Sequence, residues 1–216
     1  GSKRIKNKNF KLINGCPMID YTIKNLINSK LFHTIHVSSD INIKNKTFYF
    51  NEIDCFKRPK EISTDKTPIY DVAKWVLKEY EKKKINFDTI CIAYATAPLL
   101  EVDDFIKACK LFEKSNKKYP LLSVCEFKPS IDEAMMLSTN RLVKPVSYKK
   151  FLTDSKKHKI YYYDTGSFIF TNKKHILEKN NKKSYLKYEL DRFKGIDINN
   201  KNDLNFVKEI LKKIKK

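Results

Sequence analysis

DTICIAY, at residues 88–94, is the stretch of sequence that decides the fold class. Apolar side chains occupy both alternating positions of this run, which is typical of a β-strand covered on both faces of its sheet. The run is followed by Ala95-Thr96-Ala97-Pro98, where small residues and a hydroxyl would suit a ligand resting on the strand end. An ordinary turn stopped by proline has the same composition, so the sequence alone leaves both interpretations open.

Helical and strand patterns alternate on both sides of this run. A helical stripe covers residues 69–80, and we expect Thr67 as its N-cap with Pro68 in the first turn. We expect further helices at residues 17–29, 102–114, 173–180 and 203–214, and further strands at residues 34–39, 121–125, 167–171 and 195–198. This alternation predicts an α/β protein with a doubly wound, mostly parallel sheet. In such sheets, ligands bind beyond the carboxyl ends of the strands.

Residues 127–163 interrupt the alternation. Their periodicity is weak, and they contain two prolines, Pro129 and Pro145. We interpret this segment as an inserted hairpin or arm in a single domain that spans residues 1–216.

The composition places the chain among globular cytosolic proteins. It is 41% hydrophobic and 12% aromatic, which is enough to build a sizeable core. The five cysteines include no C-x-x-C pair and are odd in number, so we expect reduced thiols in the cytoplasm and no zinc site. The sequence contains neither an apolar run of about 18 residues nor a signal-peptide pattern, so we expect no membrane partner.

The formal net charge of +20 raises the possibility of a nucleic-acid partner. Only four of the 45 basic residues are arginines, however, and base-reading sites favour the bidentate fork of arginine. The lysines are spread along the whole chain. We therefore interpret the charge as a solvated surface and expect no specific nucleic-acid partner, with binding of a polyanion as the weaker alternative.

Two kinds of residue could bind a nucleoside triphosphate. The basic N-terminal loop, with Ser2, Lys3 and Lys8, could wrap a polyphosphate, although a basic terminus is often only solvated. Asp40 and Asp197 each belong to the end of an expected strand, where a carboxylate could hold Mg²⁺ or could simply cap a turn.

Taken together and in order, six segments are far more specific than any one of them. They are GSKRIKNKNFKLINGCPMIDYTI (1–23), VSSD (37–40), KRPKEISTDKTPIYDV (57–72), YATAPLL (94–100), YYDTGSFIF (162–170) and GIDINNKNDL (195–204). This set, which spans nearly the whole chain, resembles the CMP-acylneuraminate synthetase family of cytidylyltransferases. The YATAP variant and the DTG ahead of an aromatic strand are most similar to the pseudaminic acid cytidylyltransferases. Sialic and legionaminic acid enzymes usually have Gln-Pro-Thr-Ser-Pro at the first of these positions.

The resemblance implies a Rossmann-like nucleotidyltransferase fold and a reaction. The anomeric hydroxyl of an acidic nine-carbon 2-keto sugar attacks the α-phosphate of CTP, and pyrophosphate leaves. It also implies Mg²⁺ as cofactor and a homodimer in which the inserted arm packs against the second subunit.

The resemblance further assigns roles to individual residues. Lys8 and Asp197 are the implied catalytic residues. The implied nucleotide-binding residues are Ser2, Lys3, Lys8, Asn9 and Arg58, the substrate-binding residues are Tyr94, Thr96 and Asp164, and the metal ligands are Asp197 and Asn199.

The chain departs from the family pattern at two places. The family's Ile-Pro-Ala-Arg-Gly strand and loop would lie ahead of Gly1, and the usual Asp-x-Asp metal pair reads Asp197-Ile198-Asn199. Asn199 offers a carbonyl oxygen but no negative charge, which predicts weaker Mg²⁺ binding. Two alternatives therefore stay open: the same chemistry on sialic or legionaminic acid, and a catalytically weakened relative that binds nucleotide or partners.

Overall fold

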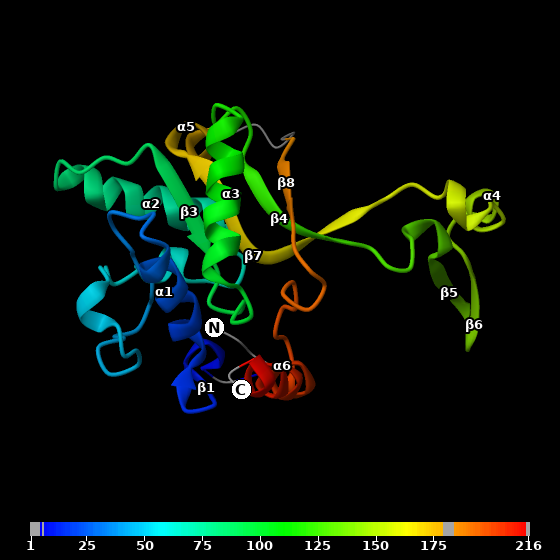
Figure 1. Cartoon of the computed structure of the whole chain (residues 1–216), viewed down its shortest axis with the longest axis horizontal. Coiled ribbons are helices and arrows are strands. Elements are labelled where there is room, and N and C mark those ends of the chain that lie inside the picture. Colours follow the sequence, from blue (N-terminus) through cyan, green and yellow to red (C-terminus); the bar gives the residue numbers. More distant parts are fainter. Residues whose placement is uncertain (1–4, 6, 179–183, 215–216) are drawn as a thin grey trace.

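A computed structural model describes residues 5, 7–178 and 184–214 of the chain. It is an α/β structure in which a central four-stranded sheet is covered by helices, and a long arm projects from the sheet (Figure 1). Among the described residues, no helix has the length and apolar character that a membrane crossing requires. All five cysteines are free thiols.

The central sheet has the strand order β3-β7-β4-β8. Its strands are β3 (Thr89–Ala93), β4 (Leu121–Glu126), β7 (Tyr162–Asn172) and β8 (Leu186–Glu189). Strand β7 runs antiparallel to both β3 and β4, whereas β8 runs parallel to β4. Three of the four strands therefore point the same way, and the predicted, mostly parallel sheet has one reversed strand at its centre.

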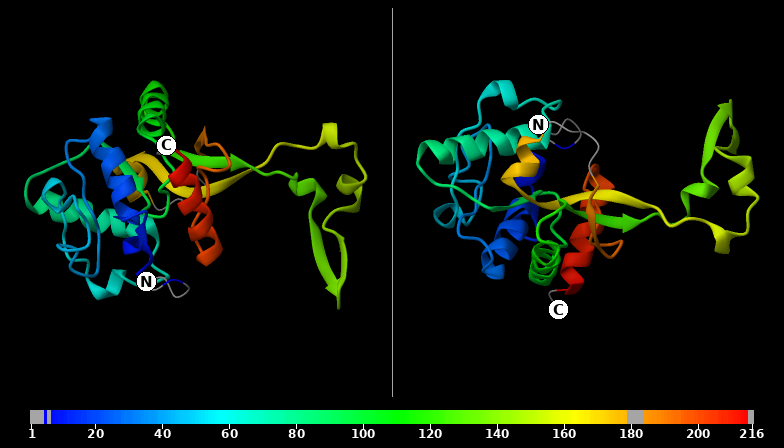
Figure 2. Two further views of the ribbon diagram at one scale, coloured as in Figure 1. Left: turned by 60° about the horizontal axis from the view of Figure 1, so that its bottom comes forward. Right: turned by 90° about the horizontal axis from the view of Figure 1, so that it is seen from above.

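Helices cover both faces of this sheet, as a doubly wound fold requires (Figure 2). Helices α1 (Met18–Ser29) and α3 (Val102–Lys114) pack together on one face, and α2 (Ile69–Lys82) and α5 (Lys173–Leu177) lie on the other. The final helix, α6, spans Lys201–Ile214.

Helix α3 matches its prediction at both ends. Glu101 and Asp104 form a reciprocal capping box at its start, which fixes the first turn. The predicted N-cap of α2 was wrong: Pro68, in an extended conformation, is the N-cap. The hydroxyl of Thr67 instead pairs with that of Thr64 at 2.9 Å.

Two predicted strands are absent from the sheet. Residues 34–39 make only isolated bridges, from His36 to Asp54 and from Ser39 to Lys57. A local pattern specifies an extended chain but not a hydrogen-bonding neighbour, and here a groove separates this segment from β3. Residues 195–198 form an irregular connection to α6, anchored by the fully buried Ile198.

Two buried clusters form the core. The larger one surrounds four phenylalanines between α3 and the sheet: Phe105, Phe112, Phe168 and Phe170. The smaller cluster joins the N-terminal segment to α6 through Ile13, Met18, Ile198 and Val207. It holds the first and last parts of the described chain together, and this contact positions the candidate site.

The arm leaves the body between β4 and β7 and extends far from the sheet (Figures 1 and 2). It contains the hairpin of β5 (Met135–Thr139) and β6 (Leu142–Pro145), followed by the short helix α4 (Tyr148–Phe151).

A second small hairpin, β1 (Leu12–Ile13) with β2 (Cys16–Pro17), precedes α1. Short 3₁₀ turns lie at Lys8–Phe10, Phe50–Glu52, Lys60–Ile62, Ile131–Glu133 and Ser155–Lys157.

Candidate active site

Lys8 and Asp197, predicted as the catalytic pair, lie next to each other. The Nζ of Lys8 donates a 2.6 Å hydrogen bond to the carbonyl oxygen of Ile198, 190 residues away in the sequence. The same Nζ lies 3.9 Å from Oδ1 of Asp197. The Lys8 side chain is 15% exposed and that of Asp197 is 45% exposed. The carboxylate thus keeps an open side toward solvent, while the ammonium group is held against the protein.

The connection that carries Asp197 is braced by the start of α6. Asn200 and Asp203 cap this helix reciprocally, because Asn200 accepts from the Asp203 backbone N–H and Asp203 accepts from that of Asn200. Asp203 also accepts from the Asn199 backbone N–H at 2.8 Å. The side-chain amide of Asn199 donates to Oδ2 of Asp197 at 2.9 Å, so it orients the carboxylate.

The donor set at this point suits a cation that keeps most of its own water and phosphate ligands. Within the described residues, no three or more His, Cys, Asp or Glu side chains gather as a metal cluster. Mg²⁺ is commonly bound through one or two carboxylates together with substrate phosphates. The exposed Asp197 carboxylate fits that mode, and a rotation of the Asn199 amide would turn its carbonyl oxygen toward the same place.

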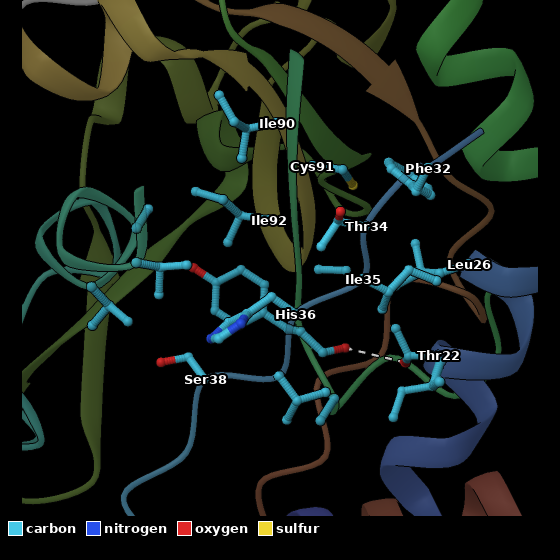
Figure 3. Close-up of a pocket in the computed structure, with 18 of the residues that line it drawn as sticks. Thr22, Leu26, Phe32, Thr34, Ile35, His36, Ser38, Ile90, Cys91 and Ile92 are labelled. Atoms are coloured by element: carbon cyan, nitrogen blue, oxygen red, sulfur yellow. Dashed lines mark hydrogen bonds between the residues drawn. The ribbon is translucent and has the colours of Figure 1, made fainter. Parts of the chain in front are cut away.

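A groove of about 440 Å³ runs along β3 and brings three other predicted residues together, namely Asn9, Arg58 and Tyr94. Its walls are largely apolar (Figure 3). Ile90 and Ile92 of β3 lie on the same side as His36 and Ser38.

Tyr94 is fixed by its backbone at the end of this groove. Its N–H donates to the carbonyl of Ser167 at 2.9 Å, and its carbonyl accepts from the Thr22 hydroxyl at 3.3 Å. Burial raises the pKa of the Tyr94 phenol, and the negative charge of Asp164 raises this pKa further. Tyr94 therefore remains a neutral hydrogen-bonding group close to Asp164.

Arg58 is positioned from several directions. Its Nε donates to the Ser63 hydroxyl at 3.1 Å, and its backbone N–H donates to the Ser39 carbonyl at 2.8 Å. Its Nη2 lies 4.0 Å from Oδ1 of Asp40. Asp40, which the sequence suggested as a possible metal ligand, thus lies beside a guanidinium group instead.

A second cavity, of about 560 Å³, lies beside Asp197 and contains Asp164 in its wall. Asp164 begins a tight turn in β7, where its Oδ1 accepts from the Gly166 N–H at 2.8 Å and Gly166 has a φ of +59°. The other wall contains Arg192, Phe193 and Phe206. Asp197 thus lies where Lys8 meets a cavity lined by a predicted sugar-binding residue.

The remaining predicted residues are not brought into these cavities. Ser2 and Lys3 lie outside the described residues. Thr96 is half-buried in the turn after β3, outside the lining of either cavity. Sequence reasoning did not single out His36, Arg192 or Phe193. The basic-aromatic pair Arg192-Phe193, one residue ahead of the GIDI segment, was the signal available for the last two.

Known proteins that are similar to this chain are cytidylyltransferases, as the sequence motifs predicted. The cytidylyltransferase family profile matches residues 1–215. The pseudaminic acid cytidylyltransferase of Campylobacter jejuni subsp. jejuni serotype O:2 is 31% identical over 98% of this chain and 92% of its own length. The N-acylneuraminate cytidylyltransferase of Escherichia coli O18:K1:H7 is 26% identical over 99% of this chain and 50% of its own.

The fold also matches solved structures. That of CMP:2-keto-3-deoxy-manno-octonic acid synthetase complexed with CTP superposes with a TM-score of 0.72 at 12% identity, covering 99% of this chain and 95% of its own.

Proposed function

The chain belongs to the cytidylyltransferase family, and on that premise we propose that it transfers CMP from CTP to a pseudaminic acid-like nine-carbon 2-keto sugar acid. The anomeric hydroxyl oxygen of the sugar forms a bond to the α-phosphorus of CTP, and the bond from this phosphorus to the bridging β-phosphate oxygen breaks. Pyrophosphate leaves, and the hydroxyl proton passes to solvent. The product is a CMP-sugar.

The observation that carries this proposal is the 3.9 Å approach of Lys8 to Asp197. A cation next to a solvent-facing carboxylate provides one group for phosphate oxygens and one for a metal ion that such oxygens also bind. Phosphoryl transfer needs little covalent help from the protein beyond this neutralisation and in-line positioning. Lys8 is already anchored to the Ile198 carbonyl, so little reorganisation is needed when substrate binds.

Each of the two cavities would bind one of the two substrates. Asn9 and Arg58 in the groove along β3 would bind the nucleotide, with Ser2 and Lys3 on its phosphates. The cavity beside Asp197 would take the sugar, where Asp164 accepts hydrogen bonds from its hydroxyls. Tyr94 lines the groove, and the negative charge of Asp164 raises the pKa of its phenol. Tyr94 would therefore lie where the two substrates meet, with Thr96 in the following turn.

We assign Mg²⁺ to Asp197, with Asn199 as a neutral neighbour. When bound, the ion would neutralise charge on the CTP phosphates. Asn199 holds the carboxylate at 2.9 Å and so restricts its rotation. The Nζ of Lys8 lies 3.9 Å from the opposite oxygen, Oδ1.

The relatives support the choice of sugar. Pseudaminic acid cytidylyltransferase is 31% identical over nearly the full chain, compared with 26% for the N-acylneuraminate enzyme. The sialic and legionaminic acids stay as alternative substrates. A weakened relative that only binds nucleotide is favoured by one feature, the neutral Asn199 in place of a second acid.

We also propose that the arm joins two copies of the chain into a homodimer. Several of its apolar side chains are more than half exposed, including Leu137, Leu142, Val143, Val146 and Leu152. Several exposed apolar side chains on one projecting element are typical of a protein interface. A second copy would cover these side chains.

The proposed reaction is tested by pyrophosphate release from CTP with pseudaminic, legionaminic and N-acetylneuraminic acids, and from UTP as a control nucleotide. We expect release with CTP and pseudaminic acid to exceed the other pairs. Preference for another acid would reassign the sugar. Binding of CTP without release for any acid would establish the weakened relative.

A further inference from the structure

Arg192 is an unpaired cation in the wall of the cavity beside Asp197. The charged side chains of this wall are Asp164, Asp197 and Arg192. Arg192 takes part in none of the ion pairs or side-chain hydrogen bonds formed among the described residues. Its backbone lies in an exposed turn between β8 and α6, so the guanidinium group can be reached by a ligand.

The charge of Arg192 is felt inside the cavity. Burial raises the pKa of Tyr163, a residue of the same wall, and the positive charge of Arg192 opposes this shift. Arg192 and Tyr163 line the same cavity, so a ligand in this cavity would also lie within reach of the Arg192 charge. A ligand carboxylate placed here would be repelled by Asp164 and Asp197 and attracted by Arg192 alone.

Arginine is a rare choice in this chain. The other arginines are Arg4, Arg58 and Arg141, against a large excess of lysine. Arginine differs from lysine in presenting a planar fork that binds both oxygens of a carboxylate. Its use at this cavity suits recognition of a carboxylate rather than general neutralisation of charge.

An apolar wall adjoins Arg192. Phe193 and Phe206 are 57% and 46% exposed, and their ring centroids lie 6.3 Å apart at 33°. Two aromatic rings left open at the rim of a cavity can pack against methyl and acyl groups of a ligand. The wall therefore presents one carboxylate receptor beside one apolar surface.

We propose that Arg192 binds the carboxylate of the sugar acid through its guanidinium fork, while Phe193 and Phe206 contact the sugar's apolar substituents. This inference rests on the proposed function. It makes Arg192 the residue by which the enzyme distinguishes a sugar acid from a neutral sugar.

The test compares Arg192→Ala, Arg192→Lys and a control, Arg141→Ala, which alters an exposed arginine in the turn of the arm hairpin. A charge-assisted hydrogen-bonded pair contributes about 1.5–3 kcal/mol, so we expect Arg192→Ala to raise KM for the sugar acid about 10- to 100-fold. KM for CTP should stay within about twofold of the wild-type value, because the nucleotide would bind in the groove along β3 and not beside Arg192. Arg192→Lys should recover only part of the loss.

A second measurement separates this inference from the proposed reaction. Calorimetry would follow binding of the sugar acid and of its neutral carboxamide to the intact chain without turnover. We expect the wild type to prefer the acid and Arg192→Ala to bind acid and carboxamide equally. If the wild type binds the acid and Arg192→Ala binds it as tightly, the role of Arg192 is overturned whether or not the chain turns over CTP. If the wild type binds no sugar acid, both proposals fall.

Discussion

The ammonium group of Lys8 lies between two features of one loop, the carbonyl oxygen of Ile198 at 2.6 Å and the carboxylate of Asp197 at 3.9 Å. Ile198 is fully buried in the cluster that ties the N-terminal segment to α6. The buried side chain of Ile198 fixes the position of its own carbonyl group. This carbonyl in turn holds the ammonium group of Lys8 beside Asp197, the preceding residue.

Replacement of Lys8 by alanine should reduce kcat/KM by about 10²-fold or more, as expected for the loss of one preorganised electrostatic donor. The rate of pyrophosphate release measures this directly. Lys11→Ala is the matched control, because Lys11 is an exposed lysine three residues away. Near-normal turnover of Lys8→Ala, or an equal loss in Lys11→Ala, would remove Lys8 from the mechanism.

The metal assignment predicts opposite effects for two neighbouring substitutions. Asp197→Ala should abolish turnover at any practical Mg²⁺ concentration, because it removes the charged ligand. Asn199→Asp should lower the Mg²⁺ concentration needed for half-maximal rate, because it adds a second carboxylate. Magnesium titrations of the rate, with CTP saturating, give both values.

Asp203→Asn is the control for this experiment. Asp203 caps α6 and accepts from the backbone of Asn199 and Asn200, so its loss should lower stability by about 1 kcal/mol. It should leave the Mg²⁺ requirement unchanged. The assignment fails if Asp197→Ala keeps activity with the wild-type Mg²⁺ dependence.

Helix positions in this chain follow from local sequence, whereas strand pairing depends on residues that are distant in the sequence. The helix at Val102–Lys114 could be predicted to the residue because its stripe and its capping pair are local signals. The strand expected at residues 34–39 could not, because pairing depends on a neighbour that local sequence does not specify. The antiparallel direction of β7 could not be predicted either, because it depends on which strands lie beside β7 in the sheet.

The candidate site divides in the same way. The family resemblance assigned roles to Lys8 and Asp197, but the approach of Lys8 to Asp197 follows from the packing of α6 and Ile198 against the N-terminal segment. Arg192 was missed because the basic-aromatic pair that it forms with Phe193 is a weak signal in a chain with so many lysines. Its significance comes from the cavity that it lines.

Gly195 provides a stability prediction at the floor of the same cavity. A Cβ at this position would clash with Sγ of Cys125 and would lie 2.8 Å from Cγ2 of Thr165. Gly195→Ala should therefore lower the free energy of unfolding by about 1–3 kcal/mol, as overpacking of a core does. Urea denaturation measures the change. In the double variant Gly195→Ala with Cys125→Ala, part of the loss should be recovered; strictly additive losses would contradict the clash.

The arm predicts how the chain assembles. Leu137→Asp should shift the mass measured by light scattering at micromolar concentration from dimer to monomer, because it places a charge in the proposed apolar interface. Phe48→Asp is the control: Phe48 is 70% exposed, against 71% for Leu137, but lies outside the arm. A wild-type protein that is already monomeric would end the dimer proposal.

His36 predicts how stability depends on pH. Its Nδ1 lies 3.2 Å from the Tyr80 hydroxyl, and its ring packs against Phe56 with centroids 4.6 Å apart. Burial lowers the pKa of His36 to about 4, with Lys83 adding to the shift and Asp54 opposing it. In the unfolded chain the pKa returns to its ordinary value near 6.5.

The direction of the change in stability with pH depends on whether the folded or the unfolded chain binds the proton at His36. Between pH 6.5 and 4 the unfolded chain is protonated at His36 and the folded protein is not, so acid favours unfolding. Stability should be unaffected by this group above pH 6.5 and should fall by up to roughly 3 kcal/mol as the pH drops to about 4. In His36→Gln, which keeps a polar group beside Tyr80, the difference in unfolding free energy between pH 7 and pH 4.5 should be smaller. The exposed His33→Gln should retain the wild-type difference. Equal pH dependence in wild type and His36→Gln would mean that His36 titrates normally in the folded protein.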